Sequence, residues 1–213
     1  MPPAPPAVPL PDSDAAPGAF AARVAQVAAE RSGAWTAFAD ILATPDAATA
    51  TRLRSGELTA LWRAGVSWIG TDVEMFTGAL MSLDVYARGA QRRSLDSDLA
   101  ALALDHTVLV ASHSTELHHL REVAQACDRE AAAWTAGDVS LGRELRAHQH
   151  ALVVSALVPV LPELGETLSA SARAHVWRAL GRLLLAFVSI ETGQDYQRAL
   201  LGAARARYLD PSA

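Results

Sequence analysis

The chain has 213 residues, is 51% hydrophobic and carries a formal net charge of −5. This length supports one sizeable hydrophobic core, so we expect one folded domain. All 18 basic side chains are arginines, which excludes the lysine-bearing phosphate loop of many nucleotide-binding enzymes. The negative charge also disfavours contact with a nucleic-acid backbone and favours a basic partner.

The N-terminal segment is rich in proline. Residues 1–17 hold seven of the eleven prolines and no basic side chain, a composition unsuited to a helix or to a secretory leader. We assign residues 1–18 to a disordered arm and residues 19–213 to an all-helical domain. No apolar run reaches the roughly 20 residues needed to cross a bilayer. We therefore expect no stable membrane insertion. Cys127 is the single cysteine, so an internal disulfide is excluded. Because we find no export signal, we expect a cytoplasmic protein.

The rest of the chain predicts a single-domain, all-α helical bundle. Turn dipeptides are sparse, and no window alternates for long with a period of two, so strands have little support. In chain order, the predicted helices cover residues 19–43, 45–55, 57–68, 71–88, 95–112, 116–136, 138–157 and 169–208.

Several helix ends carry recognisable signals. Thr44 is expected to cap the second helix, with Pro45 at its first position, and residues 71–74 (TDVE) form a capping box. The pair Ser32-Gly33 allows a break in the first helix, and Gly193 a break in the last. Pro159 and Pro162 are expected in a connecting segment. The five tryptophans and the apolar residues 175–187 predict the core.

Residues 113–123 (HSTELHHLREV) hold three of the seven histidines and two glutamates. Glu116 and His119 form the Glu-x-x-His pattern of di-iron bundles, but a second such pair is missing, because Glu144 and His148 are four residues apart. No His-Glu-x-x-His zinc signature occurs. We therefore favour a histidine-rich surface turn over a metal site. A metal site formed by His113, Glu116, His119 and His148 remains the first alternative, and it predicts stoichiometric iron or zinc.

Other kinds of chemistry have less support. The chain contains neither a Gly-x-Gly motif nor a Gly-x-Ser-x-Gly elbow, and Cys127 lies in an amphipathic helix where a small buried hydrophobe is expected. A helical transcription regulator is the second alternative. Its basic recognition helix is expected in the first third of the chain, which holds only scattered arginines.

Four segments, taken in order, resemble one family of helical proteins. Residues 31–58 (RSGAWTAFADILATPDAATATRLRSGEL) combine an aromatic-bearing helix ending in Ala and Pro with a short helix and a Gly-Glu-Leu turn. Residues 99–110 (LAALALDHTVLV) are similar to a later helix, with His106 in place of the usual tyrosine. Residues 129–164 and 178–191 resemble a charged helix with a Gly-Asp restart and a final core helix. The family is that of the TorD/DmsD/NarJ molybdoenzyme assembly chaperones, and the resemblance implies a TorD-like bundle.

The resemblance also implies a function. Such chaperones hold the catalytic subunit of a molybdopterin oxidoreductase in the cytoplasm, often by its twin-arginine leader peptide, until the cofactor is inserted. Their acidic Pro-x-Asp-His loop has a glutamate four residues after the histidine. His118 and Glu122 keep this spacing, although Leu117 stands in place of the aspartate.

We therefore expect a partner-binding surface and no enzyme activity, catalytic residue, metal or cofactor. Neither nucleic acid nor a fixed oligomer is implied, and the protein is expected to be a monomer or a homodimer. The expected partner-binding residues are His118, Glu122, Glu116, His119 and Asp128.

Overall fold

A computed structural model describes residues 17–67 and 74–193. Within these ranges the protein is an all-α bundle without strands, which confirms the predicted fold class. The helices are α1 (Pro17–Leu42), α2 (Ala47–Ser55), α3 (Glu57–Gly65), α4 (Glu74–Arg88), α5 (Leu95–Asp105), α6 (Ser114–Leu117), α7 (His119–Thr135), α8 (Val139–Leu152), α9 (Leu161–Ser171) and α10 (His175–Thr192). Short 3₁₀ turns cover Ala90–Arg92 and Ala111–His113, and π-helical turns cover His106–Val110 and Val153–Leu157.

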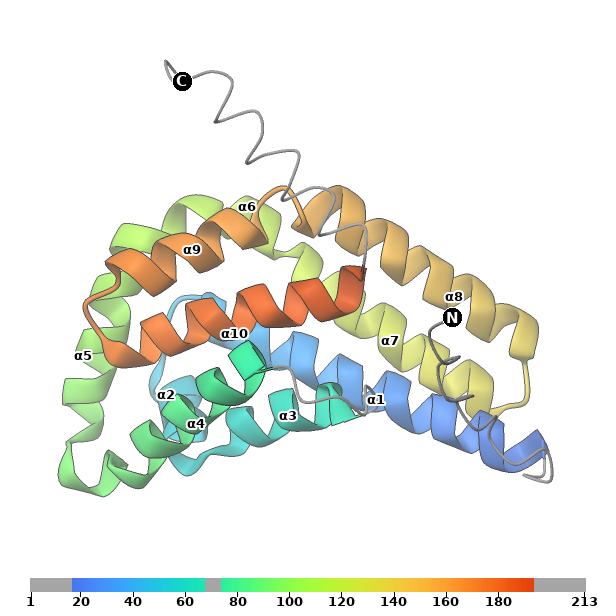
Figure 1. Ribbon diagram of the computed structural model, residues 1–213, viewed down its shortest axis with the longest axis horizontal. Coiled ribbons are helices and arrows are strands. Elements are labelled where there is room, and N and C mark those ends of the chain that lie inside the picture. The colour runs from blue at the N-terminus through green and yellow to red at the C-terminus, as the bar shows by residue number, and fades with distance from the viewer. Residues whose placement is uncertain (1–16, 68–73, 194–213) are drawn as a thin grey trace, which may run out of the picture.

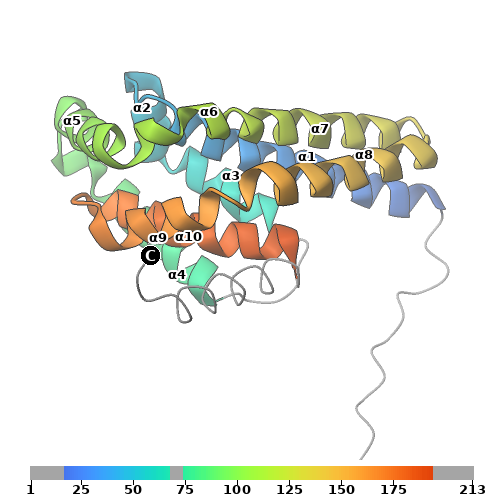
Figure 2. The ribbon, with the colours of Figure 1, turned by 90° about the horizontal axis from the view of Figure 1, so that it is seen from above.

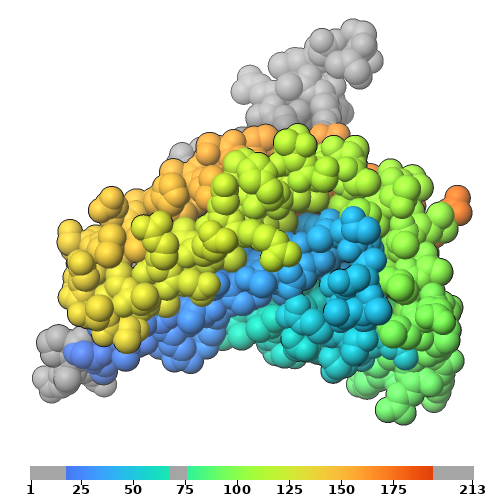
Figure 3. All heavy atoms as spheres, turned by 180° about the vertical axis from the view of Figure 1, so that it is seen from behind, coloured from blue at the N-terminus to red at the C-terminus, as the bar shows by residue number. Residues whose placement is uncertain are grey.

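The helices form two packed layers (Figures 1 and 2). One layer contains α1 and α7, which pack along each other, and α8, which packs on α7. The other layer contains α10 between α9 and α4 (Figure 1). The space-filling view from behind shows α7 and α1 side by side on one face (Figure 3). This arrangement brings the start, middle and end of the described chain into contact.

Aromatic side chains from three helices fill the centre of the bundle. Trp35 and Phe187 meet edge to face with ring centroids 4.9 Å apart, and Phe38 lies 5.2 Å from both Trp62 and Phe187. All four side chains are almost fully buried. Because aromatic rings bury large apolar areas and prefer tilted contacts, this cluster fixes α1, α3 and α10 against one another. The expectation that α10 is central to the bundle is confirmed.

Helix boundaries differ from the prediction at several places. The helix predicted from residue 169 is divided, because α9 ends at Ser171 and α10 begins at His175. Asp46, not Thr44, caps α2, because its carboxylate accepts a hydrogen bond of 2.7 Å from the backbone N–H of Thr49. Helix α1 continues without a break through Gly33. Helix α9 was not predicted, because its prolines suggested a connecting segment. Pro162 lies in its first turn, where the missing N–H has no cost.

Other predicted features lie partly or wholly outside the described residues. These are the arm over residues 1–16, the first three residues of the box at 71–74, Trp68 and the chain beyond residue 193. Helix α1 begins at Pro17, two residues inside the range assigned to the arm. Helix α10 ends as expected at Thr192, before Gly193.

Within the described residues, no single helix is both long and apolar enough to cross a membrane. Residues 139–157 and 161–171 satisfy those conditions only as a pair, and that pair is bent by 56°.

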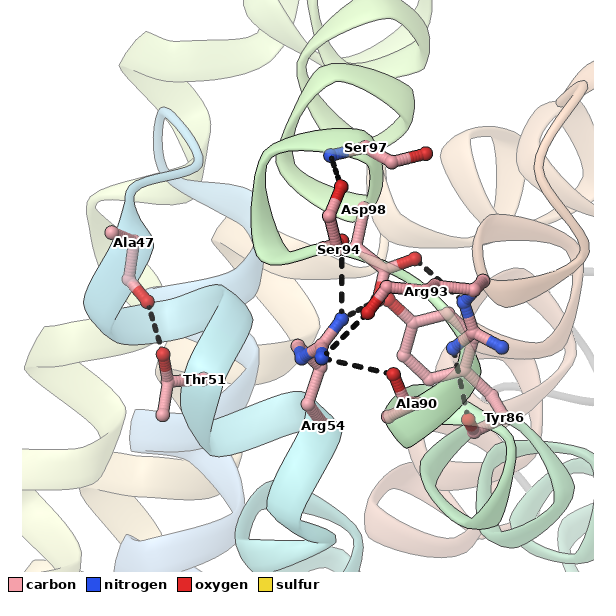
Figure 4. A network of polar contacts seen from close by, with 9 residues as sticks. All are labelled: Ala47, Thr51, Arg54, Tyr86, Ala90, Arg93, Ser94, Ser97 and Asp98. Atoms are coloured by element: carbon pink, nitrogen blue, oxygen red, sulfur yellow. Dashed lines mark hydrogen bonds and ion pairs between the residues drawn. The ribbon is translucent and has the colours of Figure 1, made fainter.

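A polar network joins α2 to the start of α5 (Figure 4). The guanidinium of Arg54 donates to the Asp98 carboxylate and to the carbonyl oxygens of Ala90 and Arg93, the latter two at 2.9 and 3.0 Å. Arg93 donates to the other oxygen of Asp98 at 2.7 Å and lies 4.4 Å from the centre of the Tyr86 ring. Asp98 is buried. The network therefore holds two arginines in structural roles.

Candidate functional site

A groove of about 430 Å³ opens where the C-terminal end of α1 meets the π-helical turn after α5 and the start of α7. Its apolar lining includes Leu42, Val110 and Leu117, and its polar lining includes His118 and Arg121. Its volume is in the range of roughly 300–1,000 Å³ that is typical of small-ligand pockets.

The π-helical turn shapes the wall of this groove. His106 and Val110 point inward and are buried, whereas Val108, between them, is 70% exposed. The Nε2 atom of His106 lies 3.2 Å from the carbonyl oxygen of Leu42, at the end of α1. A π-helical turn inserts one extra residue into a helix and occurs frequently at functional sites. Here it joins α5 to α1 and leaves the apolar side chain of Val108 in solvent.

His118, His119 and Glu122 form a cluster at the junction of α6 and α7. The Nδ1 atom of His119 lies 2.6 Å from Oε2 of Glu122, and Nε2 of His118 lies 3.9 Å from Oε1 of the same carboxylate. The imidazole centroids are 3.8 Å apart. The cluster is partly exposed, with side-chain exposures of 54% for His118, 29% for His119 and 49% for Glu122.

The electrostatic environment of the groove is mixed. The hydrogen bond from His119 lowers the pKa of Glu122, and the nearby charges of His119, His118 and His148 act in the same direction. Arg121, on the groove wall, donates to Asp40 at 3.0 Å. The charged side chain that lines the groove is thus an arginine already paired with an acid, and the carboxylate beside the groove, that of Glu122, contacts His119.

The structure brings together three of the five expected partner-binding residues. His118 lines the groove, and His119 and Glu122 adjoin it. Glu116 lies one turn earlier in α6, where one carboxylate oxygen is buried and accepts no hydrogen bond from the described residues. Asp128 is exposed on α7, six residues beyond Glu122. Six residues turn a helix by about 240°, so Asp128 and Glu122 face different directions.

The alternative metal site does not form with the predicted members. Among the described residues, the one set of three histidine, cysteine or acidic side chains with ligand atoms all within 4.8 Å of one another is His118, His119 and Glu122. His113 and Glu116 do not belong to it. The predicted set placed His113 on the same helix as Glu116, whereas His113 lies in the 3₁₀ turn before α6.

The main polar feature that sequence reasoning missed is a buried network around Arg31. The Nε atom of Arg31 donates to Glu191 at 2.8 Å, and Nη2 donates to the second oxygen of the same carboxylate. Nη1 donates to Gln149 at 2.8 Å and lies 3.6 Å from Glu130. Four helices, α1, α7, α8 and α10, each contribute one side chain.

Gln149 and Cys127 complete this network. The Gln149 amide donates to Glu130 at 2.8 Å, and its oxygen accepts a contact of 3.2 Å from the Cys127 thiol. Burial raises the pKa of Glu130, an effect that Gln149 and Arg31 only partly oppose. Burial also raises the pKa of Cys127 to about 12. The thiol is therefore protonated and inert at neutral pH, as expected from the sequence.

A signal for this network exists in the sequence. Glu130 interrupts the apolar stripe of α7 between Cys127 and Trp134, and Gln149 interrupts the stripe of α8 between Leu145 and Val153. A polar side chain at a buried helical position requires a partner, so both positions predict a polar contact inside the bundle.

The arginines of the first third of the chain do not form a basic surface for nucleic acid. Arg31 is buried. Arg52 pairs with Asp40 and Glu57, Arg54 with Asp98, and Arg63 with Asp84.

Compared with models of protein families, with curated proteins and with solved structures, the chain shows no significant match.

Proposed function

We propose that this protein is a cytoplasmic assembly chaperone. It binds the immature catalytic subunit of a molybdopterin oxidoreductase, through a leader peptide with a twin-arginine motif, and holds it until the cofactor is inserted. The proposal continues the resemblance of four ordered segments to the TorD/DmsD/NarJ family. It requires neither a catalytic residue nor a bound cofactor, because binding acts on the unfinished client by mass action.

The groove beside α6 is the observation that carries this proposal. Ala43 and Ala111 are exposed apolar residues of its lining, in front of the buried side chains of Leu42 and Leu117, and the hydrophobic part of a leader can pack on them. Glu122 adjoins the groove through its contact with His118. Carboxylates next to an apolar groove suit a ligand that carries arginines beside an apolar segment.

The arginine pairing described above also fits a protein partner better than a nucleic acid. A DNA-binding protein needs basic side chains directed at phosphates. Here Arg52, Arg54 and Arg63 form ion pairs within the bundle. The net charge of −5 favours a basic leader.

Two experiments test the proposal. The first is a tagged pull-down from the native host with identification of co-purifying chains by mass spectrometry. Enrichment of a large molybdopterin-type subunit supports the proposal and identifies the client. The second measures binding of that subunit's synthetic leader by fluorescence anisotropy. Recovery of no such subunit contradicts the assigned function.

A matched pair of variants tests the groove itself. Ala111 is exposed and lines the groove, whereas Ala101 is exposed on α5 and does not. An arginine at 111 fills the groove and repels a basic leader, so Ala111→Arg is expected to weaken leader binding by at least about tenfold, which is about 1.4 kcal/mol. Ala101→Arg adds the same charge elsewhere and is expected to bind as the original protein does. Equal affinities for both variants contradict the groove assignment.

A further inference from the structure

The two adjacent histidines at the α6–α7 junction both contact one carboxylate, that of Glu122. Glu122 lies four residues after His118 and three after His119, the two spacings at which side chains meet on a helix. His118 keeps right-handed helical dihedral angles between α6 and α7. The two imidazole rings lie with centroids 3.8 Å apart and planes inclined by 39°.

The orientation of the His118 ring is fixed by the backbone. Its Nδ1 atom contacts the carbonyl oxygen of Thr115, and because a carbonyl only accepts hydrogen bonds, Nδ1 carries the proton. In the neutral ring the lone pair is therefore on Nε2, the atom 3.9 Å from Glu122. A histidine that binds a metal normally donates its other N–H to a carbonyl or a carboxylate in this way.

The remaining ligand atoms are close to the spacing that a small cation requires. The three ligand atoms lie within 4.8 Å of one another, and the closest pair is His119 Nδ1 and Glu122 Oε2, 2.6 Å apart. Bonds of about 2.0–2.1 Å in a tetrahedral site place neighbouring ligand atoms about 3.3 Å apart. To bind the ion, the distance from His119 Nδ1 to Glu122 Oε2 therefore has to lengthen slightly, and the distance from His118 Nε2 to the Glu122 carboxylate has to shorten. All three side chains are partly exposed, so rotation of the side chains suffices.

We propose that His118 Nε2, His119 Nδ1 and a carboxylate oxygen of Glu122 bind a divalent transition-metal ion of the zinc class, with water completing its coordination. Two imidazole nitrogens are borderline ligands that favour Zn²⁺ over Mg²⁺ or Ca²⁺, which prefer oxygen ligands alone, and zinc also accepts a carboxylate oxygen. Since His118 also lines the groove beside α6, the ion lies at the rim of that groove.

The test uses the full-length protein with its affinity tag removed and with prior chelator treatment. Isothermal titration with Zn²⁺ is expected to give one ion per chain. Co²⁺ is expected to give the visible absorption of a site with a low coordination number. No client is required for this measurement. Because the ion would occupy the Glu122 carboxylate that the chaperone proposal offers to the leader's arginines, leader binding is measured on the metal-free protein, so that the two results stay distinguishable.

Single variants assign the ligands. His118→Ala, His119→Ala and Glu122→Gln are each expected to weaken Zn²⁺ binding by at least about tenfold, since even loss of an outer-shell partner costs 10–100-fold. His113→Ala is the matched control, because His113 lies in the same segment but outside the cluster, and it is expected to bind zinc as the original protein does. The exposed positions leave the fold intact, which circular dichroism verifies. Failure to bind Zn²⁺, or an equal loss in His113→Ala, overturns the proposal.

Discussion

Arg31 and Glu191 lie 160 residues apart and form a two-bond ion pair inside the bundle. Their side chains are only 2% and 1% exposed. Burial alone lowers the pKa of Arg31, but the charge and hydrogen bonds of Glu191 raise it overall. The pair joins α1 to α10, and removal of one partner leaves a charge without water or its main counter-ion.

Glu191→Gln is therefore expected to destabilise the fold by about 3 kcal/mol, the lower end of the range for a broken buried ion pair. The matched control is Glu130→Gln. It removes a charge from the same network but leaves the bidentate pair in place, and its effect is expected to be less than about 1 kcal/mol. Urea denaturation of both variants gives the comparison. Equal losses would show that Glu191 is not the dominant partner.

The pH dependence of stability is expected to carry the signature of Glu130. Burial raises its pKa in the folded state above the ordinary value of a glutamate, so the folded chain holds this proton more tightly than the unfolded chain. Stability is then greatest below the unfolded pKa and falls as the pH rises through the folded pKa. Glu130→Gln removes this group, so the stability of the variant relative to the original protein should rise with pH across the weakly acidic range. Urea titrations at several pH values test this sign.

Cys127 is expected to resist thiol reagents while the bundle is folded. Its side chain is buried and its pKa is raised to about 12, so almost no thiolate is present at pH 8. Labelling by Ellman's reagent should be slow in buffer and complete in denaturing urea. Rapid labelling in buffer would show that the centre of the bundle opens readily.

The crossing of α9 and α10 is expected to tolerate no side chain at Gly181. A Cβ atom there would lie 2.6 Å from the carbonyl oxygen of Gly165 and 2.7 Å from the backbone nitrogen of Ser169. Gly181→Ala therefore forces the helices apart and should cost about 1–3 kcal/mol. In contrast, Gly78→Ala meets nothing within 4 Å in α4 and should stabilise the protein by about 0.5–1 kcal/mol. Thermal unfolding of both variants separates the two effects.

The sequence predicted most helices because their apolar residues recur with the helical period. It failed at α9, where Pro159 and Pro162 indicated a connection. The chain uses Pro162 in the first turn of a helix instead, a position where proline is compatible. Gly33 suggested a break, but a Cβ there would lie 3.2 Å from Leu61 in α3. Glycine at this position suits the close approach of α3 to α1 and does not end the helix.

The candidate site was predictable only in part. The spacing of residues 113–123 identified a histidine-rich segment and the His118–Glu122 pair. His113 lies in the 3₁₀ turn before α6 and stays outside the cluster, whereas Glu122 meets both His118 and His119 at helical spacings. The Arg31 network was not foreseen because its members come from four helices. Such convergence depends on tertiary packing, which residue spacing within one helix does not determine.

The same network constrains the order in which the protein is completed during synthesis. Arg31 leaves the ribosome early, whereas its main counter-ion is added 160 residues later. A nascent chain that extends only into α9 contains Arg31 in α1 but lacks Glu191, the carboxylate with which its guanidinium forms an ion pair. Because a buried charge without its partner is costly, we expect Arg31 to be buried with its full set of partners only after α10 has emerged. The interior of the N-terminal part of the described chain thus depends on its C-terminal part.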